Sequence, residues 1–153
     1  MEETVLFLHL LGVLVFVGGI VVAGVAFETA RRREQPAEIA LLLGLARTGA
    51  LLVVAGALLL FVCGLWLVGL EDVGFDTGWV QAAIALFVVA LLLGAYGGQR
   101  PKQARKLAAK LSEEGRSAGA ELRALLDDSA ARTANYASGA LVPVILALMV
   151  FKP

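Results

Sequence analysis

The sequence has only one cysteine, Cys63, and only one histidine, His9. A single cysteine excludes an intrachain disulfide and any metal or iron–sulfur site built from several cysteines. A single histidine excludes the HExxH motif and every other motif that needs two histidines. The sequence also lacks the glycine-rich phosphate-binding motifs and the basic–aromatic mixture typical of nucleic-acid binding. We therefore identify no catalytic residue, and the sequence favours a non-enzymatic protein that does not bind nucleic acid.

Composition is typical of an integral membrane protein. The length of 153 residues fits one domain. Apolar residues make up 59% of the chain, against about 45–50% in soluble domains, and charged residues 17%, against about 25%. The mean hydropathy is +0.85. Thirteen basic residues balance thirteen acidic ones, so only the positions of the charges are informative.

Four segments are long and apolar enough to cross a bilayer, which takes a helix of about 20 residues. They are Thr4–Phe27, Thr48–Leu70, Trp79–Gly98 and Asn135–Phe151. Short connections favour antiparallel neighbours. The sequence therefore predicts an all-α fold: a four-helix up-down-up-down bundle within a single transmembrane domain over residues 1-153. Pro143 lies inside the last segment and predicts a kink rather than a break.

Basic residues are concentrated in two of the three connections. The first connection, with Arg47 at the entrance of the second span, and the third connection hold twelve of the thirteen. The second connection, Glu71–Gly78, is acidic and has none. The positive-inside rule then predicts that both basic connections are cytoplasmic and both termini outside, in a bacterial inner (plasma) membrane. Anionic lipid headgroups are the expected partners of the basic connections.

The third connection, residues 99-134, is the only sizeable region outside the predicted spans. Pro101 suits the first turn of a helix. Apolar residues then recur at helical spacing, which predicts a cytoplasmic amphipathic helical segment. One interpretation is a pair of helices lying on the lipid headgroups, and the alternative is a docking surface for a soluble partner. The residues of this apolar stripe are Ala104, Leu107, Ala108, Leu111, Leu122, Leu125 and Leu126.

Small residues are frequent in the spans. Lipid tails are as apolar as leucine, so membrane helices associate through close packing at small residues. We expect each span to pack through such a set. The sets are Gly12, Gly19 and Ala23; Gly49, Gly56, Ala57 and Gly64; Gly94 and Gly98; and Ala137, Gly139 and Ala140.

The middle of each span carries no charged, histidine or amide side chain. Ion-coupled transporters and pumps place ionisable groups at that depth, so the sequence argues against a proton relay within one chain.

His9 is the most informative single residue. It lies in the outer part of the first span, and Cys63 and Met149 are predicted on the same side of the membrane. Imidazole, thiolate and thioether are ligands for copper, and imidazole alone can ligate haem iron. A histidine that only bonds a carbonyl or interfacial water is the competing interpretation.

The first span resembles that of a family of small bacterial membrane proteins. His9, Gly12, Gly18 and Gly19 form an LHxxG…GG pattern, similar to the first helix of the DUF2269 family of predicted integral membrane proteins. The resemblance continues through Arg47 and the C-terminal residues, and it covers most of the chain. More distantly, the first helix is similar to those of CopD-like copper-resistance proteins and HemJ-like protoporphyrinogen oxidases. Those families imply a haem or copper role for His9, although this chain has no second histidine.

Three functional hypotheses follow. The first is a non-enzymatic structural or accessory membrane subunit, as a homo-oligomer or with another membrane protein. The second is a membrane protein that binds haem b or copper through His9, with Cys63 and Met149 as further metal ligands. The third is an oligomeric channel or small-solute pore. The sequence itself names no substrate or ligand.

Overall fold

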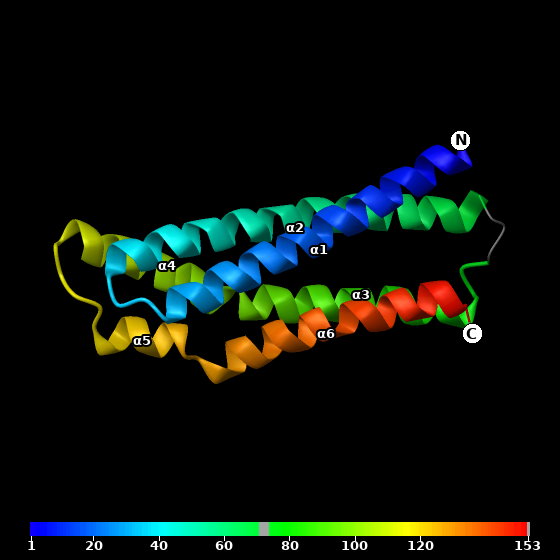
Figure 1. The fold of residues 1–153 in the computed structure, drawn as a ribbon. Coiled ribbons are helices and arrows are strands. Elements are labelled where there is room, and N and C mark those ends of the chain that lie inside the picture. Colours follow the sequence, from blue (N-terminus) through cyan, green and yellow to red (C-terminus); the bar gives the residue numbers. More distant parts are fainter. Residues whose placement is uncertain (71–73, 153) are drawn as a thin grey trace. The chain divides into compact units, whose positions relative to one another are not determined.

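The computed structural model describes residues 1–70 and 74–152. They form six helices and, within these two ranges, no strand (Figure 1). The fold is therefore all-α, as predicted. The helices are α1 (Glu2–Arg31), α2 (Pro36–Leu70), α3 (Gly78–Gly97), α4 (Gln99–Glu113), α5 (Ala120–Leu126) and α6 (Ser129–Phe151).

Four helical segments are long and apolar enough to cross a membrane, which confirms the predicted number of spans for the described residues. Two of the helices begin well before their predicted spans. α2 begins at Pro36, which suits the first helical position. α6 begins after Asp128, whose side chain accepts a hydrogen bond from the Ala131 backbone N–H at 2.8 Å. Pro143 lies inside α6, which continues to Phe151.

The chain divides into two compact units. The first unit comprises Met1–Ala30 and Leu41–Phe75, and the second comprises Arg31–Ala40 and Asp76–Pro153. Glu71 and Asp72, which the sequence places in the acidic connection, lie outside the described residues.

In the first unit, α1 and α2 are antiparallel and contact each other through glycines. A Cβ added at Gly12 would lie 2.6 Å from the Leu60 backbone nitrogen, and one at Gly49 would lie 2.5 Å from that of Ala23. A Cβ added at Gly56 would meet the backbone of Phe16. These distances leave no room for a side chain. The predicted contact sets of the first two spans are confirmed at Gly12, Gly19, Ala23, Gly49, Gly56 and Gly64.

In the second unit, α3 and α6 are antiparallel and pack together along their length (Figure 1). Their contact includes polar groups at several levels. The Ser138 hydroxyl donates to the Ala90 carbonyl at 2.7 Å. The Lys152 ammonium lies 5.6 Å from the ring centroid of Trp79. Together these contacts connect the two helices near the middle and near one end.

Of the small residues expected to pack the third and fourth spans, Gly94 is confirmed, because a Cβ added there would lie 3.3 Å from the Ser138 hydroxyl oxygen of α6. The other members of these two sets were wrongly assigned. Gly98 contacts only carbonyls of its own helix, and Gly139 has nothing within 4 Å of an added Cβ. Gly97, one residue earlier, instead lies against the Asn135 side chain. Ala137 and Ala140 are exposed, whereas Ala131 and Ala134 are buried. The helices contact each other at a different rotation, because polar residues of α6 share its packed face.

The amphipathic segment folds onto itself. α4 and α5 pack together, and most of the predicted apolar stripe is buried. Leu122 and Leu126 are 0% exposed and Leu111 is 7% exposed. The stripe was expected to face lipid headgroups or a soluble partner. The structure shows that these leucines are covered by protein, because the chain turns back after α4 and brings α5 against it.

Candidate functional site

The His9 side chain bridges the two helices of the first unit. Its Nδ1 lies 2.8 Å from the carbonyl oxygen of Leu60 on α2. The ring also lies against Gly64, one turn further along α2, where an added Cβ would be 3.1 Å from Cε1. Gly64 therefore provides the space that the imidazole occupies. The side chain is partly buried.

This contact determines which ring nitrogen carries the hydrogen. A carbonyl oxygen only accepts hydrogen bonds, so Nδ1 is the donor. In neutral imidazole, Nε2 then keeps its lone pair. The chemistry left to His9 is therefore that of one free nitrogen, as acceptor or ligand. The Nδ1–H bond itself connects α1 to α2, the role expected of a polar side chain between membrane helices.

The other two candidate ligands lie in different surroundings. Cys63 is a free cysteine on α2, buried to 5% exposure. Met149 is on α6, in the second unit. Across residues 1–70 and 74–152, no group of three or more His, Cys, Asp or Glu side chains is placed to hold a metal ion. The His9–Cys63–Met149 ligand set stays a prediction.

Two polar residues of α6 that the sequence did not single out, Ser138 and Asn135, lie at the contact with α3. Ser138 donates to Ala90, and Asn135 lies against Gly97 of α3. Both lie inside or at the start of the predicted fourth span, where a polar side chain needs an internal partner. Their position on the face that carries buried Ala131 and Ile145 was the available signal. Neither residue points to a ligand, because each contacts the neighbouring helix.

The two basic connections contact each other within the second unit. The Arg123 guanidinium of α5 donates to the backbone carbonyls of Arg31, at 2.9 Å, and Arg33. In return, Arg31 forms an ion pair with Asp127 at 2.7 Å. The carbonyls at the end of α1 carry partial negative charge, which a guanidinium neutralises. The first and third connections therefore lie at the same end of this unit.

A second ion pair lies where α3, α4 and α6 meet. Arg100 Nε lies 3.0 Å from Asp128 Oδ2, and the other Asp128 oxygen caps α6. Asp128 is thus engaged on both oxygens. Arg132, one turn into α6, is different: its Nε is shielded from solvent and has no hydrogen-bond partner within the described residues.

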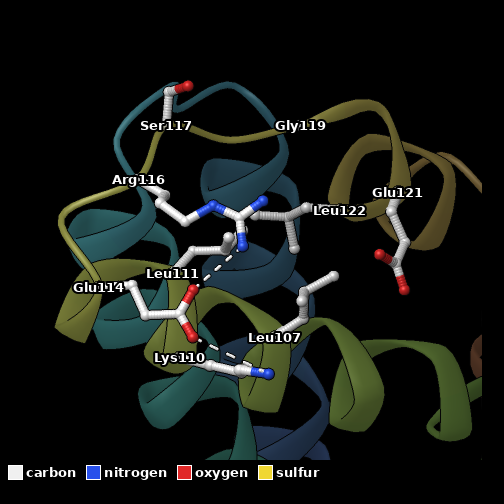
Figure 2. A pocket seen from close by; sticks show the side chains of 9 residues that line it. All are labelled: Leu107, Lys110, Leu111, Glu114, Arg116, Ser117, Gly119, Glu121 and Leu122. Atoms are coloured by element: carbon white, nitrogen blue, oxygen red, sulfur yellow. Dashed lines mark hydrogen bonds and ion pairs between the residues drawn. The ribbon is translucent and has the colours of Figure 1, made fainter.

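A small pocket of about 180 Å³ lies between the end of α4 and the start of α5. Figure 2 shows the Glu114 carboxylate between Lys110 and Arg116, at 3.9 Å and 3.1 Å. Glu121 lies apart from these ion pairs (Figure 2). Three of the four charged side chains at the pocket, Lys110, Glu114 and Arg116, are therefore paired with one another.

A family model matches almost the whole chain. The family model described as a predicted integral membrane protein, DUF2269, matches residues 3–153. No curated protein and no solved structure matches the chain significantly. The more distant similarity to CopD-like and HemJ-like proteins therefore has no support from these comparisons.

Proposed function

This chain belongs to the DUF2269 family of predicted integral membrane proteins, and from that premise we propose that it is a non-enzymatic subunit that forms homo-oligomers in the membrane. Its described helices match that role in length and composition. The protein makes contact with the lipid bilayer along these spans. We also propose that residues 1-153 form a single transmembrane domain.

The observation that carries the proposal is the use of the polar side chains inside the spans. His9 bonds the Leu60 carbonyl, Ser138 bonds the Ala90 carbonyl, and Asn135 lies against Gly97. Each connects one helix to its partner. In lipid, such groups must be satisfied internally. Their use in helix packing supports a structural role.

The oligomeric state tests this proposal. The full-length protein would be reconstituted in lipid nanodiscs, and the number of copies per disc counted by single-molecule photobleaching of a C-terminal label. We expect two or more copies per disc at a lipid-to-protein ratio at which an unrelated monomeric membrane protein gives one copy per disc. One copy per disc under the same conditions would refute the homo-oligomer.

The proposal includes an orientation, with both termini outside the inner membrane and both basic connections in the cytoplasm. The contact between these connections through Arg123 supports a common side for them. In a Cys63→Ser background, Asp76→Cys should react with an impermeant thiol reagent added to whole cells, and Ser112→Cys should not. Labelling of Ser112→Cys from outside would reverse the orientation.

The proposal also places the basic connections against anionic headgroups. A negatively charged cytoplasmic leaflet attracts each nearby Lys or Arg by about 1 kcal/mol. The apolar stripe of α4 and α5 is buried, so this attraction rests on charge and not on insertion of leucines.

A second function, haem or copper binding through His9, is favoured by one observation. Histidines that ligate metals usually donate their other ring N–H to a carbonyl or carboxylate. The bond from Nδ1 to Leu60 has this form and leaves Nε2 as the ligand atom. Haem b would need a second imidazole from another copy, and copper would use Cys63 and Met149 as further ligands. The absorption spectrum and metal content of the purified protein, compared with those of His9→Ala, test this function.

A further inference from the structure

Arg132 differs from the other basic residues near the junction of α3, α4 and α6. Arg100 is paired with Asp128 at 3.0 Å. Arg132 has no ion pair within the described residues, and its buried Nε has no acceptor. Leaving a buried charged donor without an acceptor is unfavourable, and native proteins rarely do so. The Nε has under 1 Å² of accessible surface, so a ligand from outside can meet only the two terminal nitrogens of the guanidinium, which are not shielded in this way.

Charge at this junction is also unbalanced. Asp128 is the acidic group closest in sequence, and both of its oxygens are engaged, by Arg100 and by the Ala131 backbone N–H. Arg132 lies in the first turns of α6, where the helix dipole is positive. The Asp128 carboxylate already caps this helix end, so the group left to attract a further anion is the Arg132 guanidinium, whose planar fork suits phosphate oxygens.

The depth of Arg132 points to a lipid as the source of that anion. Tyr96 on α3 and Tyr136 on α6 are 54% and 57% exposed. Gly97 lies against Asn135, so these two tyrosines lie at nearly the same level of the helix pair. Exposed tyrosines of membrane helices gather where hydrocarbon meets the headgroups.

Each tyrosine is four residues from an arginine, on the side away from the membrane centre. Tyr96 precedes Arg100, and Arg132 precedes Tyr136 in the opposite chain direction. Four residues of helix rise about 6 Å. The arginines therefore lie about one turn beyond the aromatic level, where lipid phosphates lie. Of the two, Arg100 has a protein carboxylate as partner and Arg132 does not.

We propose that Arg132 binds the phosphate group of an anionic membrane phospholipid and so holds one lipid at the junction of α3, α4 and α6. This inference rests on the proposed function only in placing the basic connections at the headgroups. It is independent of the number of copies in the oligomer.

Native mass spectrometry of the full-length protein in detergent tests the proposal, with phosphatidylglycerol and phosphatidylcholine supplied in equal amounts. Wild type should retain phosphatidylglycerol preferentially. Arg132→Gln should weaken this retention about tenfold, the effect of one lost charge-assisted hydrogen bond. The matched control, Arg105→Gln, removes a charge from α4 away from the junction and should change retention less than about twofold.

Three results would overturn the proposal: unchanged retention in Arg132→Gln, an equal loss in Arg105→Gln, or displacement of the lipid by millimolar inorganic phosphate. The last would assign the site to free phosphate. Should Arg132→Gln fail to fold, judged by its circular dichroism melt, Arg132→Lys keeps the charge without the planar fork and should show an intermediate loss. A monomer that still holds lipid through Arg132 would refute only the homo-oligomer.

Discussion

The two antiparallel helix pairs, α1–α2 and α3–α6, are held together in different ways. In α1–α2, backbone meets backbone at four glycines, and one imidazole adds a hydrogen bond. In α3–α6, Gly94 and Gly97 make space for the side chains of Ser138 and Asn135, and a hydroxyl hydrogen bond and a cation–π pair add polar contacts. Small residues thus serve two purposes in one protein: close approach of backbones, and space for polar groups.

The difference predicts how each pair responds to added volume. A backbone cannot move aside as a side chain can, so the glycines of α1–α2 should tolerate substitution least. In α3–α6, a methyl group added at Gly97 meets the Asn135 amide, part of which can rotate away, and one backbone atom, the Ala131 carbonyl oxygen. Removing a polar contact should matter more in α3–α6 than in α1–α2, although each such contact contributes little to the free energy of unfolding.

The largest effect is expected for Gly56→Leu. A Cβ at this position already meets the backbone of Phe16, so a leucine must separate the helices. We expect a loss of about 2–3 kcal/mol in the free energy of unfolding, from overpacking. The measurement is thermal unfolding in detergent, followed by circular dichroism.

Gly18→Leu is the matched control for Gly56→Leu, because nothing lies within 4 Å of an added Cβ there. Its effect should stay within about 0.5 kcal/mol. Gly115, which the sequence alone would offer as a tolerant site, is unsuitable because its φ of 63° is strained for other residues. Equal loss in both variants would show that close approach is not what holds α1–α2.

Gly97→Ala should have an intermediate effect. The new methyl group meets the Asn135 side chain and lies 2.8 Å from the Ala131 carbonyl oxygen. Overpacking of about 1–3 kcal/mol is partly offset by the gain of about 1 kcal/mol in helix propensity, so we expect a net loss near 1 kcal/mol. Combining it with Asn135→Ala should recover part of that loss in the same unfolding assay. No recovery would place the clash elsewhere.

Ser138→Ala should have the smallest effect. It removes one hydrogen bond to the Ala90 carbonyl, and such bonds between membrane helices average about 0.6 kcal/mol. Chemical unfolding by sodium dodecyl sulfate titration resolves differences of this size. Thr133→Ala, at an exposed position of the same helix, should change less. A loss for Ser138→Ala as large as that for Gly56→Leu would remove the distinction between the two pairs.

The sequence predicted the features that depend on composition and on spacing along one helix. Long apolar runs gave four spans, and the glycines of α1 and α2 were assigned to their contact because seven- and four-residue spacings place them on one face. The rotation of α6 was not predicted, because its small residues Ala131, Ala134 and Gly139 do not all share a face. Its packed face follows from its partner, α3.

The candidate site was predicted only in part. His9 was recognised as the informative residue, but its partner, the Leu60 carbonyl, is a backbone group that every residue carries and no pattern can single out. The burial of the apolar stripe of α4 and α5 by protein was not predicted, for a related reason. Helical spacing shows that a stripe is apolar, and it does not show whether lipid or protein covers it.

The most direct test of a structural role for His9 is the absorption spectrum and metal content of the purified full-length protein, compared with His9→Ala. We expect wild type to be colourless and free of stoichiometric metal. His9→Ala should keep its fold and lose about 0.5–1.5 kcal/mol, the contribution of the bond to Leu60. A Soret band or bound copper in wild type that disappears in His9→Ala would contradict this account and establish His9 as a ligand. In that case Cys63→Ser should weaken the binding of copper held by His9, Cys63 and Met149, and should leave a haem ligated by two histidines unchanged.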